Sequence, residues 1–292
     1  MRRLIVPLLL VLVCSCSTRR DVSTNAAKAR PGRSADDTIN VMTFNVRFAS
    51  ATPPNAWWQR RGVLRDCIRQ ENPDLIGTQE GVYPQLRDMA EDMGQEYDWI
   101  GLGREGGSRG EFMAVFYRKG RFVPLEYDHF WLSDTPGVIG SASWGNRVKR
   151  MVTWVKFLDN QTSKQFYFWN THFDHQVQPS REKSAELVKQ RVEALKTELP
   201  VILVGDFNAT ARKNRAYEIL TEGGFFADTY TDEEAGTFHN FSGTPGQQGR
   251  IDWILLRGPV KTVGSTRIVR YNQNGQYPSD HFPVVVPIQL GS

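Results

Sequence analysis

The sequence predicts one α/β domain that begins at about residue 39. Short apolar runs rich in β-branched and aromatic residues recur along the chain, and amphipathic segments with three- and four-residue spacing separate some of them. No internal repeat and no Pro/Gly linker follows residue 38, which favours a single domain. With 292 residues, 40% of them hydrophobic and 23% charged, the chain can bury a full core.

The segment before this domain is typical of an exported lipoprotein. Arg2 and Arg3 precede an apolar run, 4–13, that is too short to span about 30 Å of hydrocarbon as a helix. Cys16 ends a Val-Cys-Ser-Cys motif that resembles the lipobox of bacterial lipoproteins. We therefore expect a signal peptide over residues 1–15, lipidation of Cys16 and a flexible tether over 16–38. The mature protein would be periplasmic or on the cell surface, and would touch the membrane only through its lipid anchor.

Charge and cysteine content limit the kinds of partner. The formal net charge of +4 falls to +2 once Arg2 and Arg3 are removed, and no run of basic residues indicates a dedicated duplex-binding surface. Cleavage after residue 15 leaves Cys16, which carries the lipid, and Cys67, so a disulfide framework is excluded. Cys67 lies in a helical pattern and is interpreted as a small core residue. We expect a monomer.

Seven apolar runs predict strands because they are short and rich in β-branched and aromatic residues. They cover residues 39–44, 74–77, 112–117, 166–169, 201–204, 251–256 and 283–286. Segments 57–70 and 182–199 have helical spacing and precede a proline, so we expect amphipathic helices on the faces of a sheet. The polar, Gly-rich stretches are expected to be loops that shape a binding site, and they cover 101–110, 135–146 and 237–249.

Polar side chains that could bind a metal or take part in catalysis stand beside five of these strands. They are Asn45, Glu80, His172, Asp174, Asp206, Asn208, Asp280 and His281. Singly, each has a plainer explanation, since Asn often forms turns, Glu can cap a helix and a lone His is usually a core or surface residue. Burying carboxylates and imidazoles beside apolar strands is costly unless they are paired or bind a metal, so together they indicate one site. Such a set supplies the ligands and the base that hydrolysis of a charged ester requires.

With these residues in view, the chain resembles the endonuclease/exonuclease/phosphatase superfamily from about residue 39 to residue 287. The motifs are, in order, MTFNVR, TQE, NTHFD, GDFN, RID and SDH, and GDFN followed by SDH is highly specific as a pair. The resemblance implies a deoxyribonuclease I-like fold over 39–290, a four-layer α/β/β/α sandwich of two mixed sheets, with the site where the sheet ends meet. Motif spacing is most similar to the bacterial relatives of the deadenylase and nocturnin-like branch.

The resemblance also implies a metal and a base. Glu80 would be the principal ligand of Mg²⁺, for which Mn²⁺ can substitute, with Asn45 and Asp280 alongside. Asp206 would orient or deprotonate the attacking water, and Asn208 would hold that water and a phosphate oxygen.

Two imidazoles complete the expected catalytic set. His172 and His281 would donate to the phosphate oxygens as negative charge develops on them. Each imidazole needs an acceptor on its other nitrogen, and the family pattern offers Asp252 for His281 and Glu111 for His172. For Glu111 an equal alternative is a charged residue at a strand entrance.

Three further residues are expected to bind substrate, namely Arg150, Asp174 and His175. A guanidinium fork near phosphate suits Arg150, although a solvated surface arginine is an equal alternative, and His175 could instead close a turn. The expected function is Mg²⁺-dependent hydrolysis of phosphoesters, with nucleic acid or nucleotide phosphate as the favoured substrate. Phosphomonoesters and lipid head groups are the alternatives on the same site.

Two rival interpretations of the same residues are a zinc hydrolase and a non-enzymatic binding protein. THFDH also resembles part of the zinc motif of metallo-β-lactamase-like hydrolases, but Asn170 stands where that motif needs a histidine. The other rival is a surface lipoprotein that binds glycan or protein through its aromatic residues. Since Trp99, Trp154, Trp169 and Trp253 lie within or beside strand patterns, core packing is the commoner explanation for them.

Overall fold

Seven strands form the first sheet, in the order β11-β13-β1-β2-β4-β3 with β12 paired to β13. Their bounds are β1 Ile39–Asn45, β2 Leu75–Val82, β3 Tyr97–Ile100, β4 Glu111–Arg118, β11 Val260–Thr262, β12 Arg267–Ile268 and β13 Val284–Leu290. The β1–β2 pair is parallel and the neighbouring β1–β13 and β2–β4 pairs are antiparallel, so the sheet is mixed. This computed structural model describes residues 37–232 and 235–291.

The second sheet has six strands in the order β5-β6-β7-β8-β10-β9. Their bounds are β5 Phe122–Trp131, β6 Met151–Asp159, β7 Lys164–His172, β8 Val201–Asp206, β9 Ala227–Asp228 and β10 Asp252–Arg257. Here β7 and β8 are parallel and β8 and β10 antiparallel. A Cβ at Gly205 would lie 2.3 Å from the Thr171 carbonyl oxygen, so glycine is what lets β8 lie this close to β7.

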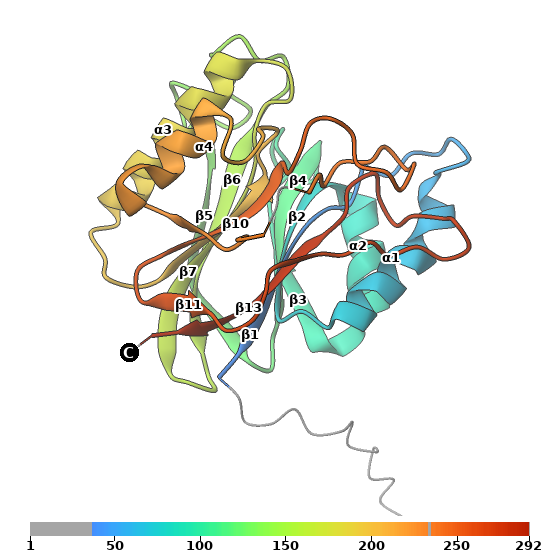
Figure 1. The fold of residues 1–292 in the computed structure, drawn as a ribbon, viewed down its shortest axis with the longest axis horizontal. Helices are drawn as coiled ribbons and strands as arrows, with labels where there is room; N and C mark the ends of the chain where they lie inside the picture. The colour runs from blue at the N-terminus through green and yellow to red at the C-terminus, as the bar shows by residue number, and fades with distance from the viewer. Residues whose placement is uncertain (1–36, 233–234, 292) are drawn as a thin grey trace, which may run out of the picture. The chain divides into compact units, whose positions relative to one another are not determined.

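Helices cover the outer face of each sheet (Figure 1). Helices α1 (Trp57–Glu71) and α2 (Tyr83–Met93) pack on the first sheet, and α3 (Gln178–Ala194) and α4 (Arg215–Thr221) pack on the second. Two short 3₁₀ helices cover Gly94–Glu96 and Glu222–Gly224. The α/β/β/α sandwich expected from the resemblance is therefore confirmed.

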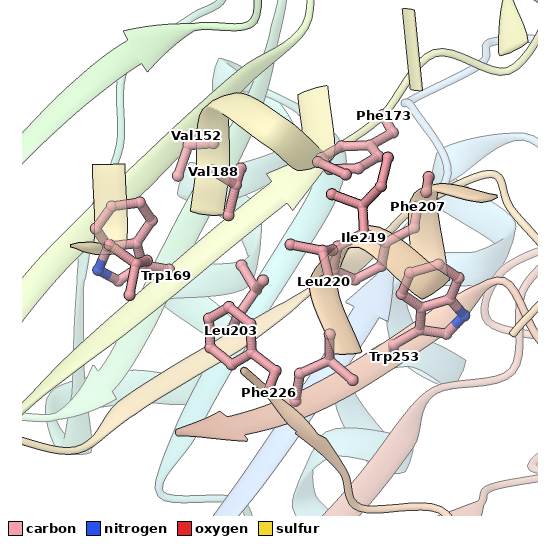
Figure 2. Packing of buried hydrophobic residues seen from close by; sticks show 14 of the residues in the cluster. Val152, Trp169, Phe173, Val188, Leu203, Phe207, Ile219, Leu220, Phe226 and Trp253 are labelled. Atoms are coloured by element: carbon pink, nitrogen blue, oxygen red, sulfur yellow. The ribbon is translucent and has the colours of Figure 1, made fainter. Parts of the chain in front are cut away.

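Strand alternation separates the core into layers. Val41 packs between the sheets while its neighbour Met42 packs under α1 and α2. The layer between the second sheet and α3 and α4 is rich in aromatic rings, and Figure 2 shows Trp253 and Phe207 close together in it. Their rings stack with centroids 4.2 Å apart. Because Phe207 follows Asp206 directly, this aromatic layer fixes the end of β8 from the side of the sheet that faces α3 and α4.

Element prediction from the sequence found seven strands and two helices and missed the edge strands and the interior strand β6. All seven predicted strands are present, and the two predicted helices correspond to α1 and α3. Strands β3, β5, β6, β9, β11 and β12 and helices α2 and α4 were not predicted. Cys67 is fully buried, as predicted. Residues 1–36, with the predicted signal peptide, Cys16 and most of the tether, lie outside the described residues. In the part that is described, no helix combines the length and apolar character needed to cross a membrane.

Candidate active site

Three acidic or imidazole side chains form a row across the second sheet. In the strand register, His172 on β7 lies opposite Asp206 on β8, and Asp206 lies opposite Asp252 on β10. All three side chains are almost fully buried. The strand pairing thus places a histidine and two aspartates side by side at one sheet end.

The first sheet adds Asn45 and Glu80 from the ends of β1 and β2. The β2–β4 register shifts between Thr78 and Gly81, and Glu80 has a φ of 64°, so a β-bulge redirects its side chain. The Asn45 Nδ2 group donates to Glu80 Oε1 at 3.0 Å and to Asp206 Oδ2 at 2.9 Å. Asn45 therefore joins the two sheets at the site.

The segment before β13 carries the last two members of the set. His281 Nδ1 lies 2.9 Å from Asp252 Oδ2, so the expected His281–Asp252 contact is formed. The Ser279 hydroxyl donates to the Asn45 carbonyl at 2.6 Å and so fixes Asp280 and His281 beside β1. His281 Nε2 lies 3.7 Å from Asp206 Oδ2.

Burial shifts the protonation of these groups in opposite directions. Burial and the nearby Asp252 raise the pKa of Asp206 to about 7, against the lowering effect of His281 and Asn45. Burial alone would lower the pKa of His281, but Asp252 and Asp206 outweigh it and raise it to about 10. The pKa of His172 is instead well below its usual value, because burial and Arg150 both disfavour its charged form. A cationic His281 and a neutral His172 therefore flank Asp206.

The expected pairing of Glu111 with His172 is not formed. Glu111 Oε2 accepts from Arg104 Nη1 at 2.5 Å, and His172 Nδ1 has no hydrogen-bond partner among the described residues. A guanidinium gives a partly buried carboxylate a full counter-charge, which a neutral imidazole cannot. His172 is held from its other side, where Nε2 lies 3.0 Å from Asn208 Nδ2.

The residues expected to bind substrate divide into two groups. Arg150 and His175 line the pocket and contact each other, with Arg150 Nη2 3.0 Å from His175 Nδ1. Asp174 does not line it, because its Oδ1 accepts the backbone N–H groups of Gln176 and Val177. Asp174 thus supports the turn that carries His175, and its role in binding substrate stays a prediction.

The site forms a pocket of about 380 Å³, which suits a small-molecule ligand. The members of the set that line it are Glu80, Glu111, Arg150, His172, His175, Asp206, Asn208, Asp280 and His281. Loops 101–110 and 237–249 also contribute, as expected, whereas none of the residues of 135–146 lines it. A larger hollow of about 530 Å³, bordered by Leu199 and Phe225, contains none of the candidate residues.

Several residues at the site were not predicted from the sequence. Arg47 and Arg104 line the pocket, and Arg60 and Gln79 support it from beneath. Asn170, noted only because it replaces a histidine, spans the two sheets. Its Nδ2 donates to the Thr78 and Ala114 carbonyls at 2.8 and 2.9 Å, and its Oδ1 accepts from Gln79 at 2.7 Å. A polar residue in a run otherwise made of apolar side chains was the available signal.

Comparison with known proteins supports these observations. Residues 42–281 match the Endonuclease/Exonuclease/phosphatase family. A crystal structure of a family protein from Bacteroides thetaiotaomicron is 32% identical with a TM-score of 0.80, and the match covers 86% of this chain and 97% of that chain. A mannosyl-6-phosphatase from the same bacterium is 32% identical with a TM-score of 0.78, over 86% and 99% of the two chains.

Two further comparisons extend the range of relatives. Protein L388 of Acanthamoeba polyphaga mimivirus is 30% identical over 274 residues, which cover 85% of this chain and 97% of that protein. The catalytic domain of human nocturnin has a TM-score of 0.68 at 17% identity, over 87% and 95% of the two chains, and shares the fold. On its motifs, its fold and these matches, the chain belongs to the endonuclease/exonuclease/phosphatase family.

Proposed function

We propose that this protein is a Mg²⁺-dependent hydrolase of phosphoesters, with Mn²⁺ as a substitute ion. One observation carries the proposal: Glu80, His172 and Asp206 come from three strands of two sheets, and each offers a ligand atom within 4.8 Å of the others. Asp206 also belongs to a second group of this kind, with Asp252 and His281. Bringing these five ionisable groups together, four of them buried and Glu80 partly buried, would be unfavourable for stability alone. Family membership gives the reaction class, since the relatives act on phosphoesters.

The donor set fits a hard divalent cation. The Glu80 and Asp280 carboxylates both face the Arg47 guanidinium, at 3.5 and 3.6 Å, so they point to one position where positive charge is favoured. Oxygen ligands of this kind suit Mg²⁺ and Mn²⁺ better than Zn²⁺. In this structure Asn45 turns its amide nitrogen toward the carboxylates, because they are acceptors, and so acts as a donor and not as the expected oxygen ligand. When bound, the ion would polarise a phosphate oxygen.

The remaining residues move the protons and hold the charge. A pKa of about 7 lets Asp206 accept the proton of a water while that water's oxygen forms a bond to phosphorus. The bond from phosphorus to the leaving oxygen then breaks, and that oxygen takes up a proton from solvent. His281, held cationic by Asp252, and the Asn208 amide are placed to stabilise the negative charge on the phosphoryl oxygens.

The substrate is proposed from the pocket and the relatives together. The sequence favours a nucleic-acid or nucleotide phosphate, whereas a relative 32% identical over 99% of its length is a mannosyl-6-phosphatase. A pocket of about 380 Å³ holds a small phosphate ester more readily than a polymer strand. A small phosphorylated molecule is therefore the substrate that we propose, with nucleotides as one member of that class.

A substrate screen with and without EDTA tests the proposal. We expect Mg²⁺-dependent hydrolysis of at least one class among sugar phosphates, nucleotides, single-stranded RNA, DNA and phospholipids, followed as released phosphate for monoesters and as cleavage products for diesters. Asp206→Asn and His281→Ala should each lower turnover at least about 100-fold, the scale of losing a general base or a charge-stabilising donor. Near-normal rates in both variants, or stoichiometric zinc with activity that Mg²⁺ does not restore, would contradict it. Absence of hydrolysis of every substrate in the screen would instead support the alternative hypothesis, a surface lipoprotein that binds glycan or protein.

A further inference from the structure

Part of the pocket carries positive charge that the proposed reaction does not use. Arg104 comes from the loop before β4, Arg150 stands directly before β6, and His175 follows β7. All three line the same pocket as Asp206 and His281. They are far apart in sequence, so their meeting depends on the fold.

Arg150 is a buried cation with unmet hydrogen-bonding capacity. Its exposure is 3%, and only Nη2 has a partner, His175 Nδ1. Neither Nε nor Nη1 finds an acceptor in the described part of the chain. The nearest carboxylate oxygen, on Asp174, lies 3.9 Å from Nε, which is too long for a hydrogen bond. Burying a guanidinium in this state is costly unless a ligand supplies the missing acceptors.

A second guanidinium is fixed in the same pocket. Arg104 Nη1 donates to Glu111, while Arg104 Nε has no partner among the described residues. Its backbone is held at both ends, because its N–H donates to the Glu111 carbonyl at 2.9 Å and its carbonyl accepts from the Trp131 indole at 2.8 Å. Arg104 therefore offers a pre-oriented Nε–H donor that its ion pair with Glu111 does not use.

We propose that Arg104, Arg150 and His175 form a subsite for the doubly charged terminal phosphate of a phosphomonoester. This proposal rests on the proposed function and names its substrate class. A terminal phosphate carries about −1.5 to −2 charge at neutral pH and three strong acceptor oxygens. Guanidinium forks match such oxygens in pairs, and Nδ1 of His175 accepts from Arg150, which leaves its Nε2–H to donate. A diester has less charge, and replaces one of these oxygens with an ester arm that accepts weakly.

The rest of the lining is suited to an uncharged, polar leaving group. Phe238, Asn240 and Gln248 belong to the 237–249 loop, and the Phe238 ring packs against His281 with centroids 5.1 Å apart. An aromatic face beside amide groups can contact the ring and hydroxyl groups of a sugar or another polyol. The structure therefore favours a phosphorylated sugar or polyol over a phosphate flanked by two chains.

Two substrates with the same leaving group test the proposal, 4-nitrophenyl phosphate and its methyl diester, each assayed with Mg²⁺. Arg150→Met should lower kcat/KM for the monoester about 100-fold and for the diester less than about fivefold, because only the dianion uses both guanidinium groups. Arg104→Met should lower kcat/KM for the monoester about tenfold, and again by more than for the diester. Arg147→Met is the matched control, since Arg147 is an exposed arginine in the same loop that does not line the pocket, and it should leave both rates within about twofold.

Phosphate binding gives a readout that does not depend on turnover. Inorganic phosphate should raise the melting temperature of the parent protein and of the Arg147 variant, but not of Arg150→Met. If Arg150→Met does not fold, Arg150→Lys replaces it as the test variant. Arg150→Lys should still bind phosphate but prefer the monoester over the diester less strongly than the parent. Equal losses for monoester and diester in Arg150→Met, or no phosphate stabilisation of the parent, would overturn the subsite. Failure to hydrolyse either ester while phosphate still stabilises the parent would count against the proposed function and leave the subsite supported.

Discussion

Arg60 is expected to control catalysis without touching the substrate. It lies on α1, has no exposed surface, and donates five hydrogen bonds, all of them to backbone carbonyls. The acceptors are Val46, Arg47, Phe48, Asn55 and Pro278, at 2.7 to 3.1 Å. These carbonyls belong to two segments, the one that follows Asn45 and the one that precedes Asp280 and His281. One guanidinium thus fastens both segments to the same helix.

The size of the effect follows from these contacts. A hydrogen bond from a charged donor contributes about 1.5–3 kcal/mol, but the five cannot be added because they share one group. Burial lowers the pKa of Arg60 to about 10, which shows that its desolvation opposes part of the gain. Gln85 Nε2 also donates to the Arg47 carbonyl at 2.9 Å, so that carbonyl keeps a donor. We therefore expect Arg60→Met to lower the free energy of unfolding by about 3 kcal/mol.

Activity should fall more than stability alone explains. If the two segments move apart by about 1 Å, turnover should drop about 100-fold in protein that is still folded. The Mg²⁺ concentration for half-maximal activity should also rise, because Asp280 and Glu80 would no longer face one position. Arg61→Met is the matched control, since Arg61 is the next residue of α1 and pairs with Asp88, Glu91 and Asp92 on α2.

The assay is urea unfolding together with turnover and Mg²⁺ titration, both measured well below the melting temperature. Arg60→Lys keeps the charge but has three donors in place of five, so it should fall between the parent and the Met variant. A folded Arg60→Met protein with turnover and Mg²⁺ response within about threefold of the parent would refute the argument.

Three other predictions concern residues outside the candidate catalytic set. Cys16→Ser should release the protein from membranes, and continued membrane fractionation would contradict the lipobox. Burial lowers the pKa of His129 to about 4, below its unfolded value of about 6.5, so stability is lost as the pH falls from about 6.5 toward 4. Between about pH 7.5 and pH 5 the free energy of unfolding, measured with urea, should therefore fall by about 2 kcal/mol less in His129→Gln than in the parent. Equal losses in the two proteins would contradict the lowered pKa of His129. Asn170→Ala should lower the free energy of unfolding by about 3 kcal/mol, because it removes a buried donor shared by the Thr78 and Ala114 carbonyls and the acceptor of Gln79, and a change below about 1 kcal/mol would show that water replaces it.

The sequence could bring the candidate catalytic residues to attention because each follows or precedes a recognisable strand. His172, Asp206 and Asp252 then meet through strand register, which the pairing of β7, β8 and β10 sets. The seven strands that were predicted are the ones with continuous apolar runs, whereas α2, which was not predicted, is more amphipathic than either predicted helix. The missed strands are mostly short or lie at sheet edges, where one face is solvated and the pattern is weak.

Long-range pairing of charged residues could not be predicted in this way. Arg60 and Arg61 are adjacent arginines on an amphipathic helix, yet one is fully buried and the other forms surface ion pairs. Arg104 lies in a Gly-rich loop and gave no sign that it would displace His172 as the partner of Glu111. Which charge is buried depends on the loops that cover it, and sequence periodicity carries no information about them.

Backbone strain at the site has the same origin. Arg47, Glu80 and Asn208 have φ angles of 52°, 64° and 48°, a region that costs a residue with a side chain roughly 1 kcal/mol or more. Each is stabilised by a neighbour in the site, since the Arg47 N–H donates to Asn45 Oδ1 and the Asn208 N–H donates to Asp206 Oδ1. The Glu80 carboxylate in turn accepts from Asn45. Because the candidate catalytic side chains also hold each other's backbone, the geometry of this site is a collective property that no single motif in the sequence encodes.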